Sequence, residues 1–378
     1  MHDVSRRATD PAVSAMQRRV APLMLVAIAA LVVGMWAGLA RIGWRLPAAD
    51  GDLMLRHGGL MVVGFVATVI GVERAVAVRT LLSLLAPAFS AAAGLALIAG
   101  AQAPVAPLFA LVAGAAYCAN IATLARQHRT LPLHLMLVGA VCLTAAAVEW
   151  TAGRGLFRVV PWWMAFLALT IGAERLDLLR FQHATRLATV VGGTAVVFIV
   201  VGPLISLGAI DIGARLLGTG LILGSGWLTV RDHPRRGVFA GGLSRYIAVG
   251  LLCAYGWLAF AGVALIAEGL TTGGWHYDAV VHAFFIGVVM SSILAHEPII
   301  APSVLGLEIP FTRLLYGPLV LLEGSLVVRI VSDAAQIAPL RPWAGLVQVL
   351  AIVLFLAIVV STIVRSRLPR REGTATDA

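Results

Sequence analysis

Charged residues are scarce in this chain, lysine is missing altogether, and cysteine occurs only three times. Charged side chains make up 12% of the 378 residues, about half of the share that is usual in a soluble domain. Hydrophobic residues reach 60% instead, and the mean hydropathy is +0.95. This balance excludes a soluble domain with a polar exterior. We therefore expect an integral membrane protein whose main partner is the lipid bilayer.

The few cysteines and the missing motifs exclude several classes of site. Cys118, Cys142 and Cys253 lie inside apolar stretches and have no metal-ligand spacing, so neither a disulfide framework nor a zinc site is expected. The chain also lacks a nucleophile elbow, a phosphate-binding glycine loop and an HExxH motif. No basic segment is interleaved with aromatic residues, so nucleic acid is not expected as a partner.

The sequence does contain a series of apolar stretches of suitable length to cross a membrane. A helix needs about 20 apolar residues to cross ~30 Å of hydrocarbon, whereas barrel strands alternate over about ten. Twelve spans are predicted, at residues 20–40, 55–73, 81–100, 104–125, 132–151, 158–174, 187–208, 210–230, 245–267, 277–297, 313–332 and 342–364. The expected fold class is an all-α integral membrane protein with twelve transmembrane helices.

The arginines predict how these spans are oriented. All 28 basic residues are arginine, and most of them fall in alternate breaks between spans or in the two ends of the chain. Cytoplasmic segments carry the excess of positive charge, so both termini are expected in the cytoplasm, as in a bacterial-type inner membrane protein. The predicted organisation is a cytoplasmic tail at 1–19, a twelve-span domain at 20–364 and a second cytoplasmic tail at 365–378.

An internal repeat indicates which spans lie at the centre. Three predicted spans, the second, sixth and tenth, end in similar tetrapeptides: Gly71-Val-Glu73-Arg74, Gly172-Ala-Glu174-Arg175 and Ala295-His296-Glu297-Pro298. Because the period is four spans, the chain is expected to form three four-helix units in a pseudo-threefold bundle. Aligning the second and tenth spans through their glutamates places His282 one residue past the position equivalent to His57.

His57 and His282 are therefore predicted at matched depth near the outer face. A lone histidine in the first turns of a membrane helix commonly bonds a backbone carbonyl or interfacial water, and that alternative stays open here. A matched pair in repeat-related helices favours a shared ligand, because polar groups within spans are functional by default.

The residues around this pair resemble a known group of haem proteins. The stretch His57-Gly-Gly-Leu-Met61 resembles the second helix of haem-copper oxidase catalytic subunits, and His282 to His296 resembles their tenth helix. The stretch that begins His282-Ala-Phe-Phe is also similar to the tenth-helix motif of the NnrS family, twelve-span haem proteins linked to nitric oxide stress and denitrification. The resemblance implies that His57 and His282 are axial ligands of a low-spin haem b.

The sequence departs from the oxidases where their active centre would be. Val280 stands where they have the high-spin haem ligand, and the sixth and seventh predicted spans lack the histidines of their copper centre. Oxygen or nitric oxide reduction at a binuclear centre is therefore not expected. The resemblance instead implies haem binding, electron transfer or a role in nitric oxide stress, with a possible redox partner.

Further residues are candidates for this or for an alternative site. Arg56, next to His57, and Arg341, before the last span, are candidate partners of haem propionates, although each could equally be an interfacial arginine. A copper site is an alternative, because His57 and Met61 share a helix face and suit Cu(I). A proton-coupled transporter is another, with carboxylates at the cytoplasmic helix ends: Glu73, Glu174 and Glu297. The role of His296, about 21 Å along the helix from His282, stays open.

Overall fold

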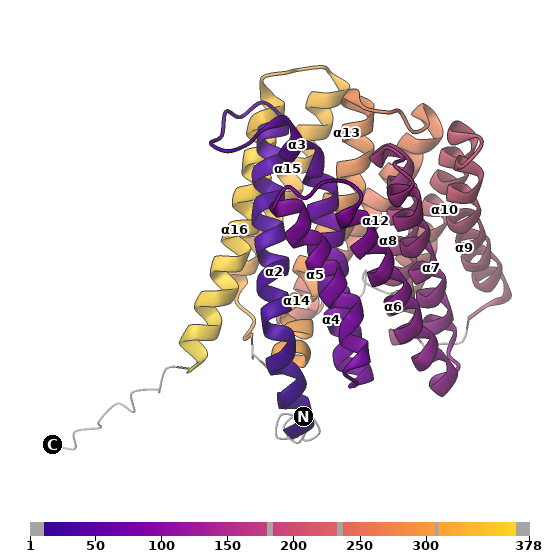
Figure 1. The fold of residues 1–378 in the computed structure, drawn as a ribbon. Coiled ribbons are helices and arrows are strands. Elements are labelled where there is room, and N and C mark those ends of the chain that lie inside the picture. The colour runs from indigo at the N-terminus through magenta and orange to yellow at the C-terminus, as the bar shows by residue number, and fades with distance from the viewer. Residues whose placement is uncertain (1–10, 180–183, 233–236, 307–308, 368–378) are drawn as a thin grey trace.

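The computed structural model describes residues 11–179, 184–232, 237–306 and 309–367, and these residues form an all-helical bundle without strands. The long helices lie side by side along one axis (Figure 1). The first half of the bundle contains α2 (Pro11–Arg41), α3 (Gly51–Gly59), η1 (Leu60–Ala67), α4 (Thr68–Val78), η2 (Leu82–Leu84), α5 (Leu85–Ile98), α6 (Val105–His128), α7 (Leu131–Thr151) and α8 (Leu156–Leu178). The second half contains α9 (Arg186–Ser206), α10 (Ile210–Arg231), α12 (Gly242–Glu268), α13 (Gly274–His282), η3 (Ala283–Met290), α14 (Ser291–Leu305), η4 (Arg313–Leu315), α15 (Tyr316–Ala334) and α16 (Leu340–Arg367).

Within the described residues each of the twelve predicted spans coincides with a helical segment, counting α3-η1-α4 and α13-η3-α14 as one segment each. Ten of these segments are long and apolar enough to cross a membrane, while α5 is a shorter apolar helix and α10 falls outside that set. The chain is therefore a multi-pass membrane protein by the length and composition of its helices.

Helical structure continues from the bundle into both predicted tails. Residues 11–19, expected in the N-terminal tail, already belong to α2, and α16 continues to Arg367. Residues 1–10 and 368–378, the rest of both predicted tails, lie outside the described residues. The start of α2 and the end of α16 lie at the same end of the bundle (Figure 1).

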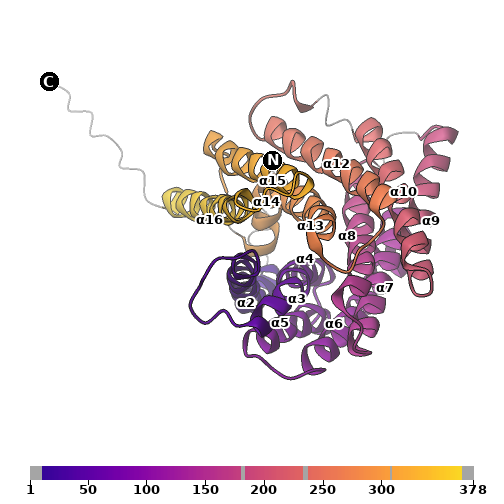
Figure 2. The ribbon, with the colours of Figure 1, turned by 90° about the horizontal axis from the view of Figure 1, so that it is seen from above.

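The helices with the repeated tetrapeptides are the most buried ones. Within the most apolar 18-residue stretch of each candidate span, the buried share of residues is 56% for Gly51–Val78, 67% for α8 and 61% for Gly274–Pro302. The same share is 22–44% for the other seven candidate spans. Seen along the axis, α8, α13 and α4 lie toward the middle, while α9 and α16 lie at the rim (Figure 2). The rim helices expose large apolar side chains such as Val197 and Val360, as expected for lipid-facing surfaces.

Both helices that carry the candidate histidines contain a π-helical stretch of eight residues, η1 and η3. Each stretch is followed by a hydroxyl side chain that bonds the carbonyl five residues earlier: Thr68 bonds Val63 and Ser291 bonds Ile286, both at 3.4 Å. π-helical turns are rare and are frequently found at functional sites. The two stretches make the walls of the pocket described next.

Candidate functional site

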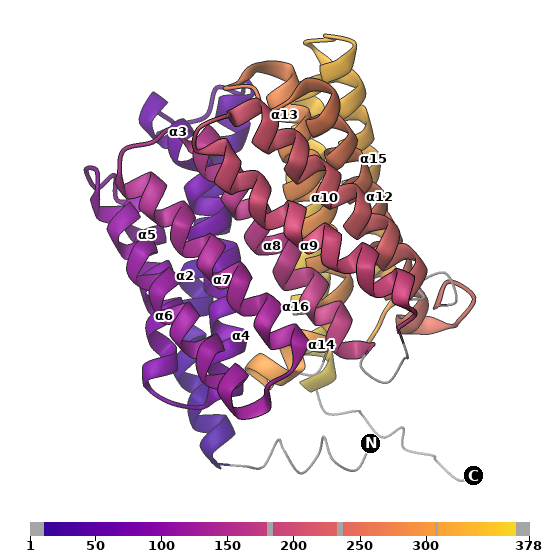
Figure 3. The ribbon, with the colours of Figure 1, turned by 90° about the vertical axis from the view of Figure 1, so that its right-hand side faces the viewer.

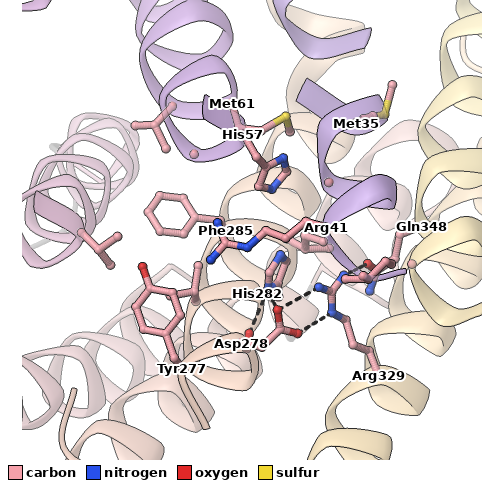
Figure 4. Close-up of a pocket in the computed structure, with 18 of the residues that line it drawn as sticks. Met35, Arg41, His57, Met61, Tyr277, Asp278, His282, Phe285, Arg329 and Gln348 are labelled. Atoms are coloured by element: carbon pink, nitrogen blue, oxygen red, sulfur yellow. Dashed lines mark hydrogen bonds and ion pairs between the residues drawn. The ribbon is translucent and has the colours of Figure 1, made fainter. Parts of the chain in front are cut away.

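The candidate site is a pocket of about 540 Å³ at the end of the bundle opposite to the start of α2. Its walls come from α2, α3-η1, α8, α13-η3, α15 and α16, so it joins the first helices of the chain to the last ones. The lining is largely apolar, and the polar residues Asp278, Arg329 and Gln348 gather beside His282 (Figure 4). This size and mixed lining are typical of cofactor and small-ligand sites.

His57 is held against the backbone of α2. Its Nδ1–H donates a hydrogen bond to the carbonyl of Gly34 at 2.7 Å. The ring also lies over Gly38, where a Cβ atom would come within 2.8 Å of the imidazole Cε1. Glycine at position 38 allows this approach, whereas a Cβ atom at Gly34 would meet Met61. About two turns before His57, the Asp50 carboxylate caps α3 by accepting a bond from the Leu53 N–H at 2.7 Å, which fixes where this helix begins.

His282 is oriented by the preceding turn of its own helix. Its Nδ1–H points to the Asp278 carbonyl at 2.8 Å, and the Asp278 carboxylate lies 3.3 Å from the same nitrogen. With Nδ1 carrying the proton, Nε2 keeps its lone pair. The same reasoning applies to His57, so both histidines present an unprotonated Nε2 as a potential metal ligand.

The two imidazoles face each other inside the pocket (Figure 4). Their ring centroids are 6.4 Å apart, and the ring planes differ by 19°. A metal ion with bonds of ~2 Å to two nitrogens separates those nitrogens by about 4 Å, and the ring centroids lie farther apart than the nitrogens do. The observed separation therefore fits two axial imidazole ligands of one metal.

A buried ionic network supports His282 from the other side. Asp278 accepts two hydrogen bonds from Arg329, at 2.8 and 3.0 Å, and forms an ion pair with Arg341 at 2.8 Å. Arg329 also donates to the amide oxygen of Gln348 at 2.9 Å, and Arg341 lies 3.2 Å from Asp333. Two acidic and two basic side chains thus balance each other, which is the arrangement that buried charges require.

Some polar atoms of this network have no hydrogen-bond partner among the described residues. They are the amide nitrogen of Gln348, Nε of Arg341 and both carboxylate oxygens of Asp333. Buried polar atoms are nearly always satisfied by protein, water or ligand. Nε of Arg341 and the nearer Asp333 oxygen face each other as the 3.2 Å ion pair, whereas the amide nitrogen of Gln348, which lines the pocket, suits a ligand with carboxylate groups or ordered water.

The pocket contains most of the residues predicted from the sequence, with one exception. His57, His282, Arg341 and the copper candidate Met61 all line it. Arg56 is not among the lining residues: it reaches the Leu97 carbonyl at 3.4 Å and pairs with Asp52 at 3.6 Å.

Apart from Arg341, the network residues were missed by the sequence analysis. Asp278 lies four residues before His282, a spacing that places both on one helix face, and Arg329 interrupts an apolar stretch. These two signals were available. Arg41 and Gln348, which also line the pocket, carry no comparable signal.

The carboxylates expected at the opposite end of the bundle partly come together there. Arg74 bridges Glu73 at 3.0 Å and Glu174 at 2.6 Å, so two of the three repeated motifs meet in one ion-pair group. His296 donates from Nδ1 to the Ser292 carbonyl at 2.8 Å, and its Nε2 has no partner among the described residues. Neither His296 nor these carboxylates line the histidine pocket.

Comparison with known proteins gives a family without an assigned activity. The chain belongs to the family described as "Domain of unknown function (DUF8744)", whose model matches residues 19–364 and so extends from α2 to α16. No curated protein matches the chain.

Proposed function

We propose that this protein is a b-type haem-binding protein of the inner membrane, with His57 and His282 as the two axial ligands. One observation carries the proposal: each imidazole donates its Nδ1–H to a backbone carbonyl, while both rings line the same 540 Å³ pocket. We further propose twelve spans in a pseudo-threefold arrangement with both termini in the cytoplasm. The helical segments and the distribution of arginines support this topology.

The donor set favours a cofactor that brings its own metal ligands. Among the described residues no group of three or more His, Cys, Asp or Glu side chains could hold a metal ion. Two imidazole nitrogens alone make a poor metal site, but they suit a metal whose other four positions are filled by a macrocycle. The apolar residues that line the pocket, such as Val62, Phe285 and Val289, suit the flat apolar face of such a group.

The chain's own residues would define the chemistry. A haem held by His57 and His282 would supply one-electron transfer. Asp278 orients His282, and the Gly34 carbonyl orients His57. The amide nitrogen of Gln348, with the Arg341 guanidinium beside it in the pocket lining, would bind the carboxylates of the cofactor. The resemblance of the histidine motifs to NnrS proteins supports a role in nitric oxide stress or electron transfer with a redox partner, without a reducing binuclear centre.

A spectroscopic experiment tests this proposal. The protein is purified in a mild detergent, and reduced-minus-oxidised spectra are recorded together with its iron and copper content. We expect a haem α-band and one iron per chain in the wild type. Replacing His57 or His282 by alanine should abolish or convert the spectrum. His296→Ala is the matched control, because His296 is absent from the pocket lining, and it should keep the spectrum.

Other outcomes would overturn the proposal and identify an alternative. Stoichiometric copper without iron would favour a Cu(I) site made by His57 and Met61, which line the same pocket. A colourless, metal-free protein would favour transport through the Glu73, Glu174 and Glu297 end of the bundle. Loss of the spectrum in His296→Ala but not in His57→Ala would move the site to that end.

A further inference from the structure

A second pocket lies at the other end of the bundle, between the end of α6 and the start of α7. It is lined by Arg126, Arg129 and His134 together with the small or apolar residues Ala122, Ala125 and Leu137. Only the two residues Arg129 and Thr130 connect the helices, so the three basic side chains lie close to one another. Figure 3 shows this connection at the lower end of the bundle.

The basic groups of this second pocket are not neutralised by the protein. Among the described residues, neither Arg126 nor Arg129 forms an ion pair or a side-chain hydrogen bond. His134 donates from Nδ1 to the Thr130 carbonyl at 2.7 Å, which leaves Nε2 unbonded within the described residues. By contrast, Arg74 at the same end is paired with two glutamates.

The backbone at Arg129 is in an uncommon conformation. Arg129 ends α6 in the left-handed conformation, with φ 43° and ψ 40°. Glycine or asparagine is the usual residue at such a position, because a side chain there costs about 1 kcal/mol. Arg79 ends α4 in the same conformation, and at both helix ends the positive charge interacts favourably with the helix dipole.

We propose that this pocket binds the phosphate group of an anionic phospholipid in the cytoplasmic leaflet. Arg126 in the last turn of α6 and Arg129 directly after that helix line the same pocket, so their guanidinium groups can both reach one phosphate. His134 adds a third nitrogen from the first turn of α7. Basic pockets between membrane helices at the cytoplasmic side are suited to such head groups.

The surroundings of the pocket favour a lipid over free phosphate. Leu131 beside it is 62% exposed, and Val141, further along α7, is 54% exposed. These side chains belong to helices long and apolar enough to cross the membrane, so the pocket opens next to a surface that acyl chains would cover. A lipid whose phosphate sits in the pocket can lay its chains along this surface, which a free phosphate ion cannot use.

The experiment compares lipids and variants in detergent micelles with the full chain. The midpoint of thermal unfolding is measured as phosphatidylglycerol, phosphatidylcholine or inorganic phosphate is added. We expect phosphatidylglycerol to raise the midpoint more than phosphatidylcholine does. The double variant Arg126→Gln/Arg129→Gln should bind phosphatidylglycerol roughly 25-fold more weakly, at about fivefold for each arginine removed.

Two further variants separate the site from general charge and from folding. Arg18→Gln/Arg19→Gln removes the same charge from exposed positions of α2 at the same end and should keep the wild-type response. Arg129→Gly fits the left-handed turn better and should fold at least as stably, yet it should lose about fivefold in lipid affinity. An equal loss in the Arg18/Arg19 variant, or an unchanged response in Arg126→Gln/Arg129→Gln, would overturn the proposal. A phosphate response equal to that of phosphatidylglycerol would overturn the lipid assignment.

Discussion

Replacing Asp278 by asparagine tests whether the buried ionic network holds the histidine pocket together. Asparagine keeps the size of the side chain but removes the negative charge that faces Arg329 and Arg341. The side chains of Asp278 and Arg329 are only 11% and 6% exposed. Removing one partner of a pair buried to this degree leaves a charge without compensation and typically costs about 3–5 kcal/mol. We expect the free energy of unfolding to fall by about that amount.

The unfolding free energy is measured by titrating the micelles with sodium dodecyl sulfate and following helix content by circular dichroism. Asp52→Asn is the matched control, because Asp52 also pairs with an arginine, Arg56 at 3.6 Å, but is 78% exposed. Its loss should cost less than about 1 kcal/mol.

A double-mutant cycle sharpens this test. Asp278→Asn/Arg329→Gln removes both charges of the Asp278–Arg329 pair, so neither residue leaves the other as an unpaired charge. The loss of unfolding free energy in the double variant should therefore be smaller than the sum of the two single losses by about 1–3 kcal/mol. A cost below about 1 kcal/mol for Asp278→Asn, or strict additivity in the cycle, would refute the reasoning that the pair is buried and mutually dependent.

Two more variants test other contacts of the bundle. Gly38→Ala places a Cβ atom 2.8 Å from Cε1 and 3.0 Å from Nδ1 of His57, so it should displace this ring and shift or abolish the haem spectrum. Gly193→Ala on α9 is the control and should leave the spectrum unchanged, because no atom lies within 4 Å of the added Cβ. A wild-type spectrum in Gly38→Ala would contradict the placement of His57. Glu323→Gln weakens two 2.6 Å hydrogen bonds, from Trp257 and from Ser291, so the same detergent titration should show a loss of about 1.5–3 kcal/mol. Glu149→Gln is the control, because the Glu149 carboxylate has no hydrogen bond or ion pair among the described residues. A loss in Glu323→Gln no greater than that in Glu149→Gln would contradict a structural role for the Glu323 carboxylate.

Hydropathy was enough to locate the helices because each helix must supply about 20 apolar residues. The predicted span at 132–151 differs by one residue from α7, and those at 187–208 and 210–230 lie within two residues of α9 and α10. The start of α2 was placed too late, because Gln17, Arg18 and Arg19 lower the local hydropathy without interrupting the helix. The π-helical stretches were not predicted, since they change the hydrogen-bond pattern and leave the composition unchanged.

The site was predictable only where the sequence contains a repeat. His57 and His282 were paired because they recur in related spans, and the structure brings both to one pocket. Arg56 was proposed because it is adjacent in sequence, but neighbours on a helix point about 100° apart, and its side chain lies outside the pocket lining. The contact between Asp278 and Arg329 could not be predicted in this way. The two residues are 51 positions apart, and their contact depends on which faces of α13 and α15 meet.

The two π-helical stretches show that the histidine pair is not a simple product of the internal repeat. η1 begins at Leu60 and η3 at Ala283, an offset of 223 residues that also relates Thr68 to Ser291. By this register the position equivalent to His57 is Val280, which is 2% exposed and does not line the pocket. His282 stands two residues later, immediately before η3, where its ring can face the pocket. Two residues turn a helix by about 200°. The repeat therefore accounts for the two inner helices, and a histidine out of register supplies the second imidazole of the pocket.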